Sequence, residues 1–241
     1  MRGVIPNYVD NCQWDSDLKV NSRIISIISM YRQFFNERLP PDKQYWSMCG
    51  AHFNKKGEIK GELGHMTDEG LIQPDQFHGV DEVKRIIDRN RKIHPDVKWY
   101  HGDFLETMEE ISTIDGKFNP HIINYDGVML PKFGTQYLSS ILNFIDDNVE
   151  GELLLTSNFV LKSPYRSNPK YKFTIHDAVA ELVKAYWLPD HWDIYPQSYV
   201  YKGASIFAKT EMGILLFVKE KHDINNITYT KDRRIANVST V

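Results

Sequence analysis

Short apolar segments alternate with segments of helical spacing through the middle of this 241-residue chain. Strands that alternate with helices are typical of a parallel sheet covered by helices on both faces. The predicted fold class is therefore α/β, a three-layer sandwich around a mostly parallel, twisted sheet. Five apolar segments have the composition of buried strands: residues 45–48, 76–80, 97–101, 121–125 and 152–158.

The two ends of the chain differ from this alternating centre. Apolar residues recur at helical spacing over residues 21–38, and Pro40 and Pro41 are expected to end that helix. Near the other end, a helical pattern at 175–186 precedes two apolar segments close enough to form a C-terminal antiparallel strand pair. We expect three parts: an N-terminal segment (1–41) whose helix packs on the core, a Rossmann-like domain (42–221) and a polar tail (222–241). The strand pair is predicted at residues 199–209 and 212–220.

Composition excludes several classes of protein. A formal charge of -3 argues against a chain that coats nucleic acid non-specifically. The two cysteines, Cys12 and Cys49, suffice for neither a disulfide framework nor a zinc site, and no metal site is predicted. No apolar run is long enough to span a membrane, and a signal-peptide pattern is missing. We therefore expect a cytoplasmic protein without a membrane partner; its oligomeric state is left open.

Three acidic residues occupy equivalent places, each directly after a predicted strand. They are Asp81, Asp103 and Asp126. Right-handed crossovers bring the carboxyl ends of parallel strands to one edge of the sheet, and ligands bind outside that edge near the switch in strand order. We expect the three acids to share one crevice with the end of the first strand, Ser47 to Gly50.

Each acid allows a binding interpretation and a structural one. Asp81 is placed to accept hydrogen bonds from a ribose diol, but it also fits a helix N-cap. Asp103 fits contact with an exocyclic amine, with Phe104 packed on a purine, and it equally fits a cap of the next helix. Asp126 follows the fourth strand, where substrate-facing groups often lie, and it also suits a turn before Gly127.

In this pattern the chain resembles the class I S-adenosylmethionine-dependent methyltransferases over residues 42 to 220. The segment YWSMCGA is similar to their first motif, QFHGVDE to the second, WYHGDFLE to the third and HIINYDGVMLP to the fourth. The resemblance implies S-adenosyl-L-methionine as cofactor and a reaction that consists mainly of aligning the acceptor with the methyl group. It implies cofactor contacts from Ser47, Gly50, Asp81, Asp103, Phe104 and Asn124, and acceptor contacts from the catalytic candidates Tyr125 and Asp126.

Two other functions stay open beside the methyltransferase. The family's first motif has an acid and two or three glycines, whereas this chain has Ser47 and Gly50, so a catalytically inactive binding or regulatory protein is the alternative. A nicotinamide-dependent oxidoreductase is disfavoured because GxGxxG is missing.

The methyl acceptor is suggested by a loop at residues 161–172. This loop interleaves basic and aromatic residues, which suits a nucleic-acid strand, although a solvated loop stiffened by prolines explains it as well. The fourth motif lacks the Asn/Asp-Pro-Pro-aromatic signature of enzymes that methylate base amines. Nucleic acid is a possible partner through this loop, without an assigned acceptor atom.

Overall fold

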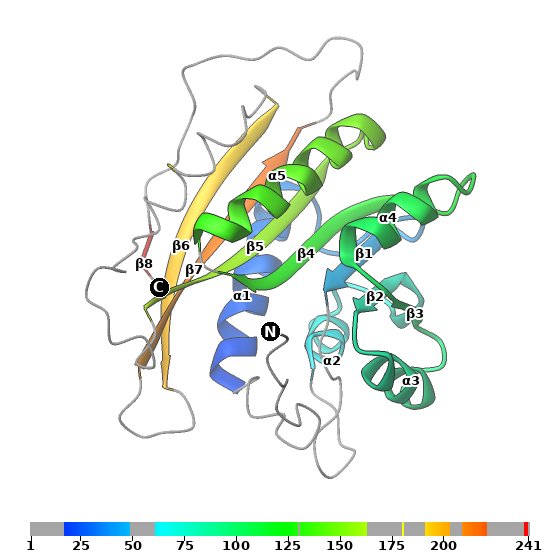
Figure 1. The fold of residues 1–241 in the computed structure, drawn as a ribbon, viewed down its shortest axis with the longest axis horizontal. Coiled ribbons are helices and arrows are strands. Elements are labelled where there is room, and N and C mark those ends of the chain that lie inside the picture. Colours follow the sequence, from blue (N-terminus) through cyan, green and yellow to red (C-terminus); the bar gives the residue numbers. More distant parts are fainter. Residues whose placement is uncertain are drawn as a thin grey trace, which may run out of the picture.

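The structure, a computed structural model, describes residues 17–48, 61–129, 131–162, 180, 191–202, 209–220 and 239–240. Helices and strands alternate along most of this part of the chain (Figure 1). The helices are α1 (Asp17–Phe34), α2 (Glu62–Asp68), α3 (Lys84–Ile93), α4 (Phe104–Ser112) and α5 (Pro131–Asn148), with a 3-10 turn, η2, at Pro74–Gln76. The strands are β1 (Gln44–Met48), β2 (Phe77–Asp81), β3 (Lys98–His101), β4 (Pro120–Met129), β5 (Leu153–Lys162), β6 (Trp192–Lys202), β7 (Lys209–Lys219) and β8 (Ser239–Thr240).

All eight strands form one sheet in the order β3-β2-β1-β4-β5-β7-β6-β8. Strands β1 to β5 run parallel, and β7 lies antiparallel between β5 and β6. The predicted α/β class, with its mostly parallel sheet and C-terminal antiparallel pair, is confirmed. The strand order reverses between β1 and β4, which is where ligands bind in open sheets of this kind.

Helices cover both faces of the sheet. Because side chains alternate along a strand, the two neighbours Tyr45 and Trp46 of β1 belong to different cores. Trp46 packs in the core formed with α4 and α5, whereas Tyr45 packs in the core formed with α1, α2 and α3. In Figure 1, α3 lies at the β3 end of the sheet, opposite the end formed by β6 and β8.

The boundaries of several elements differ from the prediction. Strand β4 continues through Asp126 to Met129 instead of ending at Tyr125, so Asp126 lies within the strand and not in a turn. The N-terminal helix ends at Phe34 rather than Arg38, because the chain turns to bury Leu39, whose N–H donates to the Leu71 carbonyl at 2.7 Å. Strand β6 begins at Trp192 and ends at Lys202, so the prediction of 199–209 started too late and ended too late. The helix predicted at 175–186 lies outside the described residues except for residue 180, which is helical. The division of the chain into three parts stays a prediction.

Within the described part of the chain, no helix combines the length and the apolar composition needed to cross a membrane.

Candidate functional site

The carboxyl ends of β1, β2 and β4 meet beside the switch in strand order. In the register of the sheet, Ser47 on β1 pairs with Gly79 on β2 and with Asn124 on β4. Asp81 ends β2, one strand away from β1. Asp126 follows Asn124 by two residues on β4, so both side chains face the side of the sheet that α1 covers.

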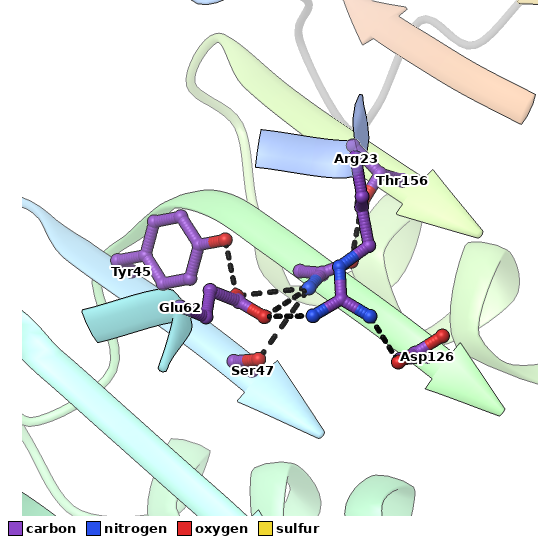
Figure 2. Close-up of polar contacts among 7 residues, drawn as sticks. Arg23, Tyr45, Ser47, Glu62, Asp126 and Thr156 are labelled. Atoms are coloured by element: carbon purple, nitrogen blue, oxygen red, sulfur yellow. Dashed lines mark hydrogen bonds and ion pairs between the residues drawn. The ribbon is translucent and has the colours of Figure 1, made fainter. Parts of the chain in front are cut away.

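A buried ion pair network joins α1 to these strand ends (Figure 2). Arg23 of α1 is only 4% exposed, and its Nη2 donates to Glu62 Oε2 at 2.9 Å. Its Nη1 donates to Asp126 Oδ2. One guanidinium thus lies between a carboxylate at the start of α2 and a carboxylate on β4, where its planar, forked donors can serve both.

Neutral side chains complete this network around Glu62. The Asn124 Nδ2 donates to both Glu62 carboxylate oxygens, at 2.8 and 2.9 Å, and the Tyr45 hydroxyl donates to Oε1. Thr156 on β5 donates to Asn124 Oδ1 at 2.7 Å, which fixes the orientation of the amide. We call Arg23, Tyr45, Ser47, Glu62, Asn124, Asp126 and Thr156 the Arg23 cluster.

The side chains of the Arg23 cluster are almost entirely buried, which strengthens the polar contacts among them. Burial and the nearby Glu62 carboxylate raise the pKa of Tyr45 well above its ordinary value, so the hydroxyl stays a hydrogen-bond donor. Ser47, Asn124 and Thr156 are fully buried. In such surroundings hydrogen bonds and ion pairs are strong, and here they join α1, α2, β1, β4 and β5.

Asp81 has a different environment. Its Oδ1 accepts a hydrogen bond from the Val83 N–H at 2.7 Å, and within the described residues its other oxygen accepts none. Burial raises the pKa of Asp81 to about 6, and the Val83 hydrogen bond and the charge of His101 offset this only in part. The register of the sheet pairs Asp81 with His101 on β3. Asp81 is therefore a half-buried carboxylate with one oxygen that accepts no hydrogen bond from the described residues.

Asp103 caps α4. Its Oδ1 accepts from the N–H groups of Leu105 and Glu106, at 2.9 and 3.1 Å, and from the Tyr137 hydroxyl at 2.6 Å. Phe104 is buried in the core beneath α4 and α5. Tyr125 is buried there too, with its ring stacked on Tyr137 at 5.2 Å between centroids. Burial, with the charge of Asp103, raises the pKa of Tyr125 above its ordinary value.

The structure thus brings only some of the predicted site residues together. Ser47, Asn124 and Asp126 meet in the Arg23 cluster. Asp81 and Asp103 each lie apart from it, with local partners of their own. Gly50 and residues 163–172 of the basic loop lie outside the described residues. The cofactor and catalytic roles predicted for these residues stay predictions.

Sequence reasoning missed the roles of Arg23, Tyr45, Glu62 and Thr156. The sequence did hold a signal for Arg23. It lies next to Ile24 and four residues before Ile27, and both isoleucines belong to the apolar surface of the helix. A charged residue at the margin of such a surface needs a buried partner. Glu62 carried no such signal, since its segment is polar and glycine-rich.

Replacing Asp103 by alanine is expected to lower the free energy of unfolding by about 1–2 kcal/mol, because two first-turn N–H groups and the Tyr137 hydroxyl lose their acceptor. Urea denaturation followed by circular dichroism measures the change. Glu110→Ala removes the same charge from an exposed position of α4 and should shift stability by less than about 0.5 kcal/mol. Equal effects of the two substitutions would show that Asp103 contributes charge alone.

Comparisons with known proteins agree with this architecture at low similarity. No model of a protein family matches the chain, and no curated protein sequence does. A TehB-like SAM-dependent methyltransferase from Corynebacterium glutamicum is 12% identical with a TM-score of 0.38, over 86% of this chain and 100% of that one. An O-methyltransferase from Bacillus cereus, solved in complex with SAH, is 12% identical with a TM-score of 0.43, over 88% and 96%. TrmN from Thermus thermophilus is 11% identical with a TM-score of 0.44, over 80% of this chain and 47% of that one.

The sheet itself defines the fold: five parallel strands with a switch between β1 and β4, followed by an antiparallel β7 inserted between β5 and β6. The described part of the chain therefore has a Rossmann-like α/β fold, with the arrangement of strands expected from the resemblance to the class I methyltransferases.

Proposed function

We propose that this chain binds S-adenosyl-L-methionine at the carboxyl edge of β1, β2 and β4 and transfers its methyl group to an acceptor. The observation that carries the proposal is the carboxylate of Asp81. It ends the strand next to the switch point, is half-buried, and has one oxygen that accepts no hydrogen bond from the described residues. A ribose diol has the two donors that such a carboxylate lacks.

The methionine end of the cofactor would lie next to the Arg23 cluster. The cluster lies at the ends of β1 and β4, adjacent to the strand that Asp81 ends. When bound, the cofactor supplies a methyl group that its sulfonium already makes electrophilic.

The chain's own contribution to the transfer is alignment of the acceptor. Of the two catalytic candidates, Asp126 suits this role better, because its side chain is 13% exposed whereas Tyr125 is 1% exposed. Arg23 fixes one oxygen of Asp126, so the carboxylate has a defined orientation. Asp126 would accept a hydrogen bond from the acceptor group and receive its proton if the acceptor must lose one as it attacks.

A second function has a specific observation in its favour. Asn124 donates hydrogen bonds to Ser47 and to Glu62 at the place where the first motif would approach the cofactor, and all three residues are buried. A switch point occupied by internal contacts suits a binding or regulatory protein that has lost catalysis.

Calorimetric titration of the full chain with S-adenosyl-L-methionine, and separately with NAD, tests the proposed function. We expect binding of the first and none of the second. Transfer of a labelled methyl group to mixed DNA, RNA and protein then separates an enzyme from an inactive binding protein. If neither cofactor binds, the enzyme proposal fails.

Asp81→Asn is expected to weaken the binding of S-adenosyl-L-methionine by roughly 10- to 100-fold, because charge-assisted hydrogen bonds to the ribose are lost. The Val83 N–H keeps an acceptor, since the asparagine oxygen can occupy the place of Oδ1. Asp75→Asn is the matched control: it removes the same charge at an exposed residue of η2 and should leave the affinity unchanged.

The same substitution has a stability signature. The pKa of Asp81 is raised from 3.8 to about 6 in the folded state, so the folded state holds a proton more tightly than the unfolded state. Stability from this group is therefore lost as the pH rises from about 4 to about 6. We expect Asp81→Asn to be more stable than the unmodified chain by about 1–2 kcal/mol near neutral pH, and the gain to vanish below about pH 4. If Asp81→Asn binds S-adenosyl-L-methionine normally and shows no gain in stability, the contact assigned to Asp81 with the ribose is wrong.

A further inference from the structure

Helix α3 carries a concentration of positive charge that is unusual for this chain. Five of its ten residues are basic and one is acidic, which gives the helix a formal charge of +4. The whole chain has a formal charge of -3, so everything outside α3 sums to -7. A chain with this balance repels polyanions in general, and within the described part of the chain α3 is a local exception. The basic residues are Lys84, Arg85, Arg89, Arg91 and Lys92, and all are exposed.

The acid on this helix neutralises only part of that charge. Asp88 pairs with Lys84 at 2.6 Å and with Arg91 at 3.6 Å. The hydrogen bond from Lys84 lowers the pKa of Asp88, and the charges of Arg91 and Lys92 lower it further. One carboxylate therefore serves several cations. Arg85 and Lys92 form no ion pair within the described part of the chain.

Three of these exposed cations form a line along the helix. Arg85, Arg89 and Lys92 are related by i, i+4 and i+7, which places them on one stripe of the helix surface. At 1.5 Å per residue, the stripe is roughly 10 Å long. Lys84, Arg85, Asp88, Arg89 and Lys92 line an open hollow on this surface.

The opposite side of α3 faces the core. Ile86 and Ile87 are buried, so the helix has no apolar face left to insert into a lipid surface. Val83, just before the helix, is the exposed apolar side chain near the stripe, and a protein interface would need buried anchors that the stripe does not offer. A row of single positive charges without apolar anchors fits a chain of phosphates, which presents one negative charge at each nucleotide.

We infer that the exposed face of α3, with its stripe of Arg85, Arg89 and Lys92, binds the phosphate backbone of a nucleic acid. Guanidinium groups suit this role because their forked donors match phosphate oxygens. Helix α3 begins three residues after Asp81, so a nucleic-acid strand bound to it lies beside the carboxyl edge of the sheet. That the bound nucleic acid is also the methyl acceptor rests on the proposed function; the binding itself does not.

Fluorescence anisotropy with labelled nucleic acid tests this surface. The probes are a single-stranded RNA and a DNA duplex of roughly 20 nucleotides or base pairs, titrated with the full chain at several salt concentrations. For Arg85→Gln/Lys92→Gln we expect RNA binding about 25-fold weaker at about 0.1 M salt, and a salt dependence shallower by about 1.4 in the log–log slope. The glutamines keep helix propensity and length while removing two charges.

Arg38→Gln/Lys117→Gln is the matched control, since it removes two exposed positive charges away from α3. The control should bind nucleic acid almost as well as the unmodified chain. Equal losses in both double variants, or no binding of either probe by the unmodified chain, would overturn the inference. Binding to anionic phosphatidylserine vesicles or to poly-glutamate that matches nucleic acid and is lost in the α3 variant would overturn it as well.

This outcome is separable from that of the proposed function. Cofactor binding is read by calorimetry without nucleic acid, and nucleic-acid binding is read by anisotropy without cofactor. A chain that binds S-adenosyl-L-methionine but neither probe loses the inference and keeps the proposed function. A chain that binds a nucleic-acid probe but not S-adenosyl-L-methionine supports the role of the α3 surface and contradicts the proposed methyl transfer.

Discussion

Replacing Arg23 by methionine is expected to lower the free energy of unfolding by about 3–5 kcal/mol. The guanidinium is buried between Glu62 and Asp126, so its removal leaves two carboxylates in the interior without their cation. Methionine fills a similar volume, which limits the contribution of lost packing. Guanidinium chloride denaturation followed by tryptophan fluorescence measures the change.

Arg32→Met provides the matched control on the same helix. Arg32 is half-exposed, and its carboxylate partners Glu37 and Glu69 are exposed, at 3.4 and 3.8 Å. Ion pairs of this kind contribute less than about 1 kcal/mol. Similar losses for the two arginines would contradict the role assigned to Arg23.

A triple variant distinguishes electrostatics from packing. Arg23→Met/Glu62→Gln/Asp126→Asn removes the cation and both carboxylates together, so no uncompensated charge stays buried. We expect it to recover more than half of the stability lost in Arg23→Met. If the triple variant is as unstable as the single one, packing rather than charge holds α1 to the sheet.

The second large effect is expected at the opposite edge of the sheet, where Asp146→Asn should cost about 3–5 kcal/mol. Asp146 Oδ1 accepts hydrogen bonds from Trp192 Nε1 and His191 Nε2, both at 2.9 Å, and lies 3.7 Å from Lys219 Nζ. Lys219 is fully buried, and its ammonium also donates to the carbonyl of Val149, the residue directly after α5. The substitution would leave a buried ammonium without its carboxylate.

The pH dependence of this variant has a defined sign. Burial lowers the pKa of Lys219 from 10.5 to about 8, and the Asp146 carboxylate keeps it from falling further. In Asp146→Asn the pKa therefore falls below about 8, and the buried lysine is neutral at lower pH. We expect the difference in the free energy of unfolding between Asp146→Asn and the unmodified chain to become smaller as the pH rises to about 8. Asp147→Asn, at the exposed neighbouring position, should change stability little at any pH; a gap that does not narrow would contradict this account.

The alternation of strands and helices could be read from the sequence because it depends on local periodicity. Strands β2 and β3 are short, apolar and followed at once by helical patterns, and the structure has them within a residue or two of the prediction. Strand β6 was read wrongly at its start because Pro196 interrupts the pattern. Proline is tolerated there because, in the described part of the chain, β8 pairs with β6 only at Gln197 and Ser198.

Spatial relations between distant residues could not be read in the same way. The acids at strand ends were visible as a pattern, whereas the partner of Asp126 is a residue 103 positions earlier in the chain. Nothing local links Arg23 to that strand. The position of β7 between β5 and β6 is equally non-local, because two strands adjacent in sequence give no sign of which one meets the rest of the sheet.

The insertion of β7 has a consequence for synthesis of the chain. Strand β5 is made well before β7, and its hydrogen-bonding edge finds its partner only when residues 209–219 have left the ribosome. Until then β5 is an open sheet edge, and the arriving segment is itself apolar on both faces, with Met212 to Val218 buried once in place. A nascent chain stalled before β7 would therefore present a long template for pairing with other chains, and chaperone binding to that edge would matter most in this interval.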